Sequence, residues 1–369
     1  MKNLGFGLMR LPLKKDGSGS IDIERTKALA DSFLENGFTY FDTAACYHKK
    51  ESEGAFCEAV AKRYPREAYS ITDKLSLFML KSKEEIPGFF DNQLKTLGVD
   101  YLDIYLIHSL DKNSYATAKE WGAFEFVSEK LKEGKVRHIG FSFHGDAETL
   151  DIMLNEQPEV EYVQLQINYI DWEDEVIQSR KCYEVARKHG KKILIMEPVK
   201  GGSLANVSDK ARAEFDKIDP NMSTASFAIR FAASLPGVVM VLSGMSNEAQ
   251  LEDNMSYMKD FVPFTEGEIE TVINIADAIK NEIAIGCTGC RYCVDFCAQN
   301  IMIPDYFNYY NIYHRFKSLP WRDKNALNDI MKNNGKPSDC IECGACETHC
   351  PQSLDIRELL KITKAAFEK

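Results

Sequence analysis

Two copies of one cysteine spacing, C-x2-C-x2-C-x3-C, constrain this chain more than any other feature of its sequence. They consist of Cys287, Cys290, Cys293 and Cys297, and of Cys340, Cys343, Cys346 and Cys350. A reducing cytosol disfavours disulfides, so cysteines at this density favour metal ligation. The other cysteines are scattered through the rest of the chain. We therefore expect two domains, a cysteine-poor body of residues 1–280 and a cysteine-rich tail of residues 281–369.

The composition is that of an ordinary globular protein and excludes several other classes. Of the 369 residues, 44% are hydrophobic and 27% are charged, which is enough apolar material for a large core. No run approaches the ~18 apolar residues of a membrane span, and the N-terminus lacks a secretion signal. The net charge of -11 gives no general attraction to phosphate backbones. We expect a cytoplasmic protein that binds neither membranes nor nucleic acid.

Eight short β-rich runs recur along the body, and helix-like amphipathic stretches separate them. The runs cover residues 4–9, 38–41, 69–72, 103–107, 136–141, 162–167, 192–196 and 238–242. Helices are predicted over residues 23–36, 86–97 and 175–189, because a glycine follows each one as a stop signal. Eight strand–helix units in one body fit a closed parallel (β/α)8 TIM barrel, an α/β fold, better than an open sheet.

Polar or ionisable residues end most of these runs. They are Asp42, Lys74, His108, Ser142, Gln164, Glu197 and Ser243. In a parallel barrel the C-terminal ends of the strands meet at one mouth, where the chemistry of such folds takes place. Any one of these residues could merely end a strand, but seven in register indicate a functional site.

Four residues in this series carry a resemblance to a known family. Asp42 and Tyr47, then Lys74 on the next run and His108 on the one after, resemble the catalytic tetrad of the aldo-keto reductases. Residues 4–11 resemble the first strand of that family. The resemblance covers about residues 1–280. It implies an oxidoreductase that interconverts a small carbonyl compound and an alcohol by hydride transfer, with NADP or NAD as cofactor.

The chemistry explains the residue types in the tetrad. Hydride addition to a carbonyl builds negative charge on oxygen, which must be stabilised and protonated. Tyrosine has a reference pKa of about 10, and a nearby ammonium such as Lys74 eases proton release. By analogy with the family, Tyr47 is the general acid/base, Asp42 pairs with Lys74, and His108 orients the carbonyl oxygen. Taken alone, His108 would be read as a core histidine with satisfied hydrogen bonds.

Cofactor-binding residues also follow from the resemblance. Ser142 and Gln164 match positions that hold the nicotinamide carboxamide in the family. The stretch after the last run resembles the nucleotide-binding segment through Ser243, Gly244, Met245, Ser246, Gln250, Asp253 and Asn254. A loop that leads into a helix N-terminus is a favourable place for phosphate.

Two departures from the family pattern affect cofactor binding. Gly244 and Gln250 stand where many NADPH-preferring members carry a basic pair, so both NADP and NAD stay open. Glu197 stands where many members place an aromatic ring against the nicotinamide. It could instead pair with Lys200 or contact the substrate, and the sequence does not choose between the two.

The cysteine runs resemble the ligand runs of bacterial two-cluster ferredoxins, with zinc as the alternative ligand. The resemblance implies a small, mainly helical ferredoxin-like domain that binds two 4Fe–4S clusters. One cluster would use Cys287, Cys290, Cys293 and Cys350, and the other Cys340, Cys343, Cys346 and Cys297. The spacer between the runs is rich in aromatic residues, which we expect to form a local core stripe packing the tail onto the barrel.

The whole chain thus resembles the ferredoxin-fused branch of the aldo-keto reductases. We expect an NAD(P)H-linked carbonyl/alcohol oxidoreductase whose clusters serve electron transfer, with a ferredoxin or another electron carrier as partner. One alternative keeps the hydride chemistry and makes the clusters purely structural. Another is a non-catalytic redox-sensing or electron-transfer module whose barrel binds nucleotide.

Overall fold

Eight parallel strands close into a barrel in sequence order, β1 to β8, which confirms the predicted (β/α)8 topology. The strands are β1 (Leu4–Gly7), β2 (Tyr40–Asp42), β3 (Ser70–Leu75), β4 (Leu102–Leu110), β5 (Val136–Phe143), β6 (Tyr162–Gln166), β7 (Lys192–Met196) and β8 (Val238–Ser243). This computed structural model describes residues 2–16, 18–280 and 282–368. Leu4 of β1 pairs with Val241 of β8, which closes the ring.

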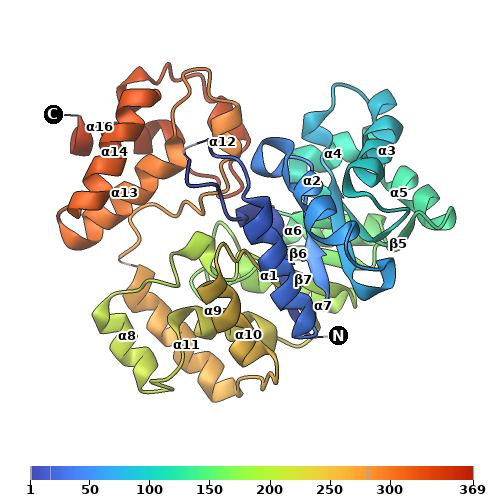
Figure 1. The fold of residues 1–369 in the computed structure, drawn as a ribbon, viewed down its shortest axis with the longest axis horizontal. Coiled ribbons are helices and arrows are strands. Elements are labelled where there is room, and N and C mark those ends of the chain that lie inside the picture. Colours follow the sequence, from blue (N-terminus) through green and yellow to red (C-terminus); the bar gives the residue numbers. More distant parts are fainter. Residues whose placement is uncertain (1, 17, 281, 369) are drawn as a thin grey trace. The chain divides into compact units, whose positions relative to one another are not determined.

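The chain forms two units (Figure 1). The first consists of Met1–Pro198 and Ser226–Gly267 and contains all eight strands. The second consists of Val199–Ala225 and Glu268–Lys369 and contains both cysteine runs. The domain boundary expected at residue 280 stays a prediction.

The inside of the barrel is filled by apolar side chains. Tyr40, Ile104, Leu106, Leu194, Met240 and Leu242 form one buried cluster there. Side chains alternate along a strand, so the residues between them on β4, such as Tyr105, face the surrounding helices. The barrel is therefore a packed core rather than a pore, and its chemistry must take place at the strand ends.

Helices follow the strands along the chain up to residue 280. They are α1 (Ile23–Glu35), α2 (Ser52–Phe56), α3 (Ile86–Leu97), α4 (Lys112–Glu120), α5 (Ala123–Lys132), α6 (Ala147–Glu156), α7 (Ser179–Lys188), α8 (Asp209–Asp216), α9 (Thr224–Ser234), α10 (Glu248–Met258) and α11 (Glu266–Lys280). The predicted ends of α1 and α3 agree closely with the structure. In the part of the chain that the structure describes, no helix is long and apolar enough to cross a membrane.

The helix predicted from residue 175 begins only at Ser179. The carboxylate of Asp174 accepts the backbone N–H groups of Val176 and Ile177, each at 2.9 Å, and holds them in a turn. Gln178 then has a left-handed backbone (φ 55°). The predicted start was therefore wrong, because a local side-chain hydrogen bond replaced the first helical turn.

The C-terminal part of the chain is helical, as expected for the tail. It contains α12 (Tyr292–Asp295), α13 (Ile303–Phe316), α14 (Trp321–Asn333), α15 (Ala345–Thr348) and α16 (Ile356–Phe367). In Figure 1, α13, α14 and α16 form its orange and red bundle. Tyr306 and Phe307 of the aromatic spacer are fully buried in its core, beside Cys293 and Cys346. Trp321 departs from the expected stripe, since it is 80% exposed.

Candidate active site and cluster-binding site

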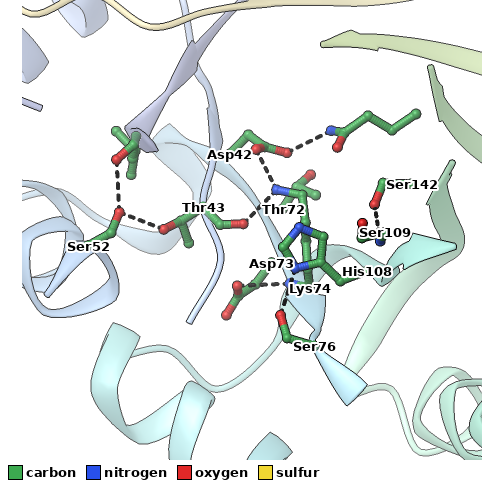
Figure 2. A network of polar contacts seen from close by, with 12 residues as sticks. Asp42, Thr43, Ser52, Thr72, Asp73, Lys74, Ser76, His108, Ser109 and Ser142 are labelled. Atoms are coloured by element: carbon green, nitrogen blue, oxygen red, sulfur yellow. Dashed lines mark hydrogen bonds and ion pairs between the residues drawn. The ribbon is translucent and has the colours of Figure 1, made fainter. Parts of the chain in front are cut away.

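An ion pair between Lys74 and Asp42 lies where β2 and β3 end (Figure 2). Lys74 Nζ lies 2.6 Å from Asp42 Oδ1 and donates a second hydrogen bond to the carbonyl oxygen of Thr43 at 2.7 Å. The lysine is fully buried, and Asp42 is 4% exposed. Burial opposes the charge of Lys74, but the nearby acidic groups outweigh it and the pKa of the ammonium is raised. Lys74 is therefore a fixed cation inside the barrel mouth.

The rings of Tyr47 and His108 lie beside this ion pair. Lys74 Nζ is 5.1 Å from the centroid of the Tyr47 ring. The ring centroids of Tyr47 and His108 are 6.1 Å apart, in an edge-to-face arrangement. Tyr47 begins the short turn after β2, and His108 lies near the end of β4. The four residues singled out in the sequence thus come together at one end of the barrel.

Burial controls the protonation of the two rings. It raises the pKa of Tyr47, whereas the charge of Lys74 lowers it, and the pKa stays above its usual value. Burial, helped by Lys74, holds the pKa of His108 well below its usual range. At neutral pH the site therefore contains a neutral phenol and a neutral imidazole around one ammonium.

Two side chains that hold the histidine were missed in the sequence. Ser76 Oγ lies 2.6 Å from His108 Nδ1. The ring of Phe78 lies 5.4 Å from the imidazole, measured between centroids. Both follow Lys74 at steps of two residues, the spacing of side chains on one face of an extended chain, and this spacing is the sequence signal that could have indicated them. They fix where the imidazole can point.

Ser142 and Gln164 reach the same cluster from β5 and β6. Gln164 Nε2 donates to Asp42 Oδ2 at 3.0 Å, so this amide touches the ion pair directly. Ser142 Oγ accepts the backbone N–H of Ser109 at 2.7 Å (Figure 2). Ser109 has a left-handed backbone (φ 58°), which is strained for a residue other than glycine. Ser142 therefore stabilises the strained turn that follows His108.

Hydrogen bonds shape the loop between β8 and α10. Asn254 Nδ2 donates to Ser243 Oγ at 2.7 Å, which ties the helix back to the strand end. Asn247 caps α10 by accepting the N–H of Gln250 at 3.0 Å. The side chain of Gln250 in turn accepts the N–H of Ser246 at 2.8 Å. The loop is therefore held before any nucleotide binds.

Burial divides the residues expected to bind nucleotide. Ser243, Met245 and Asn254 are buried, so their side chains support the loop. Gly244 and Gln250 are exposed, which suits direct contact with a ligand.

Arg10 links the candidate nucleotide loop to Glu197. Its Nη2 lies 3.1 Å from Glu197 Oε1, and its carbonyl oxygen accepts the hydroxyl of Ser246 at 2.6 Å. A Cβ atom on Gly244 would lie 3.1 Å from the Arg10 side chain, so glycine permits this close packing. The sequence allowed Lys200 or a substrate as the partner of Glu197, and the structure shows an ion pair with Arg10.

The eight clustered cysteines line two cavities in the second unit. The first is lined by Cys287, Cys290, Cys293 and Cys350. The second is lined by Cys297, Cys340, Cys343 and Cys346. Within the described part of the chain, no three His, Cys, Asp or Glu side chains are arranged to hold a single metal ion. Each cavity thus receives three thiols from one run and the fourth from the other, which fits the ligand sets expected for two cubane clusters.

The two cysteine runs repeat the same local geometry. Arg291 and Gly344, each directly after the second cysteine of its run, have left-handed backbones (φ 68° and 76°). Each directly precedes a four-residue helix, α12 or α15, that carries the third cysteine. Backbone N–H groups already point at sulfur, from Gly289 to Cys287 and from Ile301 to Cys297, both at 3.4 Å. Such hydrogen bonds tune cluster potentials.

Two family models match the chain. The model "Aldo/keto reductase family" matches residues 3–277, which is well over half of the chain. The model "4Fe-4S dicluster domain" matches residues 286–354, where both cavities lie. The chain therefore combines an aldo/keto reductase domain with a ferredoxin-type domain.

Curated relatives include reductases of small dicarbonyl compounds. A glyoxal reductase of Bacillus subtilis is 33% identical over 129 residues, covering 34% of this chain and 44% of the relative. A methylglyoxal reductase of Salmonella typhi is 30% identical over 186 residues, covering 50% of this chain and 62% of the relative. The chain spans about half the length of the first curated relatives that it matches.

Solved structures show the same fold over the barrel. The holo form of an aldo-keto reductase from Bacillus halodurans superposes with a TM-score of 0.59 at 20% identity, covering 74% of this chain and 91% of that one. An aldo-keto reductase from Klebsiella pneumoniae in complex with NADPH gives 0.58 at 16% identity, covering 74% and 90%. At these identities the likeness shows the fold alone.

Proposed function

The chain belongs to the aldo/keto reductase family, and from that premise we propose that its barrel reduces a small carbonyl compound with Tyr47 as the general acid. A bound NADPH or NADH supplies the hydride, and bound 4Fe–4S clusters supply one-electron chemistry. The hydride carries two electrons to the carbonyl carbon. Tyr47 gives its proton to the carbonyl oxygen, and water then returns a proton to the phenolate.

The charges around Tyr47 support this role. Carbonyl reduction needs a proton donor that is still protonated at neutral pH, and the raised pKa of the buried Tyr47 meets that need. As the phenolate forms, the ammonium of Lys74 is in place to stabilise it. Asp42 holds that ammonium by a 2.6 Å ion pair. The ammonium that stabilises the phenolate is thus already in place and does not have to move during the reaction.

His108 and the neighbouring amides position the reactants. The imidazole stays uncharged because burial lowers its pKa, so it orients the carbonyl oxygen by hydrogen bonding rather than by charge. Gln164 and Ser142 are proposed to hold the nicotinamide carboxamide. The loop of Ser243 to Asn247, together with the N-terminus of α10, suits the nucleotide phosphates.

The two cysteine-lined cavities are proposed to hold 4Fe–4S clusters that serve electron transfer. Each such cluster would take one electron, so two clusters could accept the two electrons of one hydride, and its proton would go to water. A ferredoxin or another single-electron carrier is the partner that this chemistry requires. The observation behind this part of the proposal is the crossed arrangement of the fourth cysteines, Cys350 and Cys297.

The buried Lys74–Asp42 pair beside the Tyr47 ring carries the hydride proposal, and Tyr47→Phe tests it. With methylglyoxal as probe, the variant is expected to lose about 10² to 10⁴-fold in kcat, the usual worth of general acid catalysis. Nicotinamide binding, followed by quenching of protein fluorescence, should stay unchanged. A variant that reduces methylglyoxal at the wild-type rate would assign the proton to another group.

A further inference from the structure

A second polar cluster lies behind Lys74, on the side of β3 that faces the helices. It consists of Glu53 from α2, Asp73 from β3, Gln93 from α3 and Tyr105 from β4. Glu53 is 4% exposed, Gln93 1%, and the other two are fully buried. Asp73 is paired in register with Tyr105, whereas Lys74 is paired with Leu106 of the barrel interior. None of these four side chains has a part in the proton transfer proposed above.

The cluster contacts both the backbone N–H and the backbone carbonyl of Lys74. The backbone N–H of Lys74 donates to Asp73 Oδ1 at 2.8 Å (Figure 2). Its carbonyl oxygen lies 3.1 Å from Gln93 Nε2. The Tyr105 hydroxyl donates to Gln93 Oε1 at 2.6 Å, which fixes the amide so that its nitrogen faces the carboxyl groups. Both peptide groups of the lysine are therefore held from one side of the strand.

Two carboxyl groups share this buried space. Gln93 Nε2 lies 2.8 Å from Asp73 Oδ2 and 3.1 Å from Glu53 Oε1. Burial raises the pKa of both acids, and the charge of Glu53 and its hydrogen bond raise that of Asp73 further. Lys74 is the cation acting on Asp73, and Tyr105 is the other titratable group that faces the acids. Two buried carboxyl groups beside the same amide nitrogen disfavour ionisation of both, which favours one shared proton and one negative charge.

We propose that Glu53 and Asp73 form a positioning dyad, which shares one proton, clamps the Lys74 main chain through Gln93, and keeps a fixed negative charge behind the lysine. The dyad touches neither substrate nor cofactor and acts only through Lys74. This inference rests on the proposed function of Lys74 and Tyr47. Its charge is among the influences that raise the pKa of Lys74, so removing that charge lowers the pKa of the ammonium.

A pair of variants separates the charge from the hydrogen bonds. Glu53→Gln removes the shared proton but leaves a carboxylate on Asp73, so the charge stays. Glu53→Gln combined with Asp73→Asn removes the charge and keeps side chains of nearly the same shape. The measurement is the pH dependence of kcat and KM for methylglyoxal reduction, with thermal unfolding as a check on folding. We expect the alkaline limb of kcat to move to lower pH in the double variant alone, with KM unchanged.

Two results would overturn the proposal. One is a folded double variant whose pH profile coincides with that of the wild type, as a merely structural role predicts. The other comes from infrared spectroscopy of the wild-type protein, which needs no enzyme activity. A protonated carboxyl C=O stretch is expected at neutral pH and should disappear in Glu53→Gln; its absence from the wild type would rule out the shared proton. If the wild type reduces no carbonyl but shows this band, the proposed function fails and the shared proton stands.

Discussion

Lys74 is central to the site, because its ammonium lies among three of the other groups. Its ammonium contacts Asp42 and the Thr43 carbonyl, and it lies 5.1 Å from the Tyr47 ring centroid. Removing one partner of a buried ion pair typically costs about 3–5 kcal/mol of stability. Variants of Asp42 or Lys74 therefore mix lost stability with lost catalysis, and Ser76 is a cleaner probe of the site.

Ser76→Ala should lower kcat for methylglyoxal reduction by about five- to tenfold. The variant removes the 2.6 Å contact that orients the His108 ring, and one such hydrogen bond contributes about 1–1.5 kcal/mol. Ser76→Thr keeps the hydroxyl and should restore most of the rate. Steady-state kinetics on the three proteins provide the comparison. Equal loss in the threonine variant would mean that the hydroxyl does not orient the ring.

The sequence predicted the site residues that end strands, but not the residues that hold those side chains and their main chain in place. Asp42, Lys74 and His108 were predicted because strand ends in a parallel barrel meet at one mouth. Ser76 and the Glu53–Asp73 pair depend on which side chains of a loop, a helix and a strand come into contact. That information lies in three-dimensional packing, and neither hydrophobic periodicity nor residue spacing records it.

At the scale of secondary structure, two helices were predicted to within one residue, strand ends differ from the prediction by up to three residues, and one helix start was wrong. Strand positions follow from runs of β-branched and aromatic residues, which the barrel needs at each of its eight places. The start of α7 failed because the Asp174 carboxylate captures two backbone N–H groups first. One side chain thus decides between a turn and a helix, and the hydrophobic periodicity of the sequence does not record that choice.

The junction between β4 and β5 carries a pH-dependent element. His144 directly follows β5, and its backbone N–H donates to the carbonyl oxygen of Leu110 at 2.8 Å. Burial lowers the pKa of His144 to about 4, against about 6.5 in an unfolded chain. The unfolded chain therefore binds a proton that the folded one excludes. Above about pH 6.5 His144 is neutral in both states, so it does not reduce the unfolding free energy. As the pH falls toward about 4, the unfolded chain binds the proton first and the unfolding free energy decreases.

The unfolding free energy should thus decrease between about pH 6.5 and pH 4, and His144→Gln should flatten that decrease. Urea unfolding at a series of pH values, followed by circular dichroism, measures both proteins. A variant with the same acid-side slope as the wild type would show that His144 is not excluded from protonation in the folded barrel.

At the scale of the whole molecule, one chain combines an aldo/keto reductase domain with a dicluster domain. The aldo/keto reductase domain belongs to a family of hydride-transferring enzymes, and the dicluster domain is suited to single electrons. The proposal that the clusters serve electron transfer predicts exchange between nicotinamide and clusters. Purely structural clusters predict none.

Anaerobic titration of cluster-loaded protein with NADPH, and then with NADH, separates these possibilities. Electron transfer predicts that nicotinamide oxidation and bleaching of the cluster absorbance proceed together. Cys293→Ala, which removes a thiol from the first cavity, should reduce the bleaching, whereas Cys182→Ala in α7 serves as a matched control. Tight nicotinamide binding with unbleached clusters would favour the structural alternative.

Hydride transfer inside the barrel is the central claim, and isotope transfer tests it most directly. NADPH carrying deuterium at both C4 positions of the nicotinamide is turned over with methylglyoxal, and the product is analysed by mass spectrometry and NMR. Direct transfer predicts one deuterium on the carbinol carbon of each product molecule and a slower reaction than with unlabelled cofactor. A product that carries only solvent hydrogen at that carbon would contradict the account, because the electrons would then have reached the substrate separately from the hydrogen.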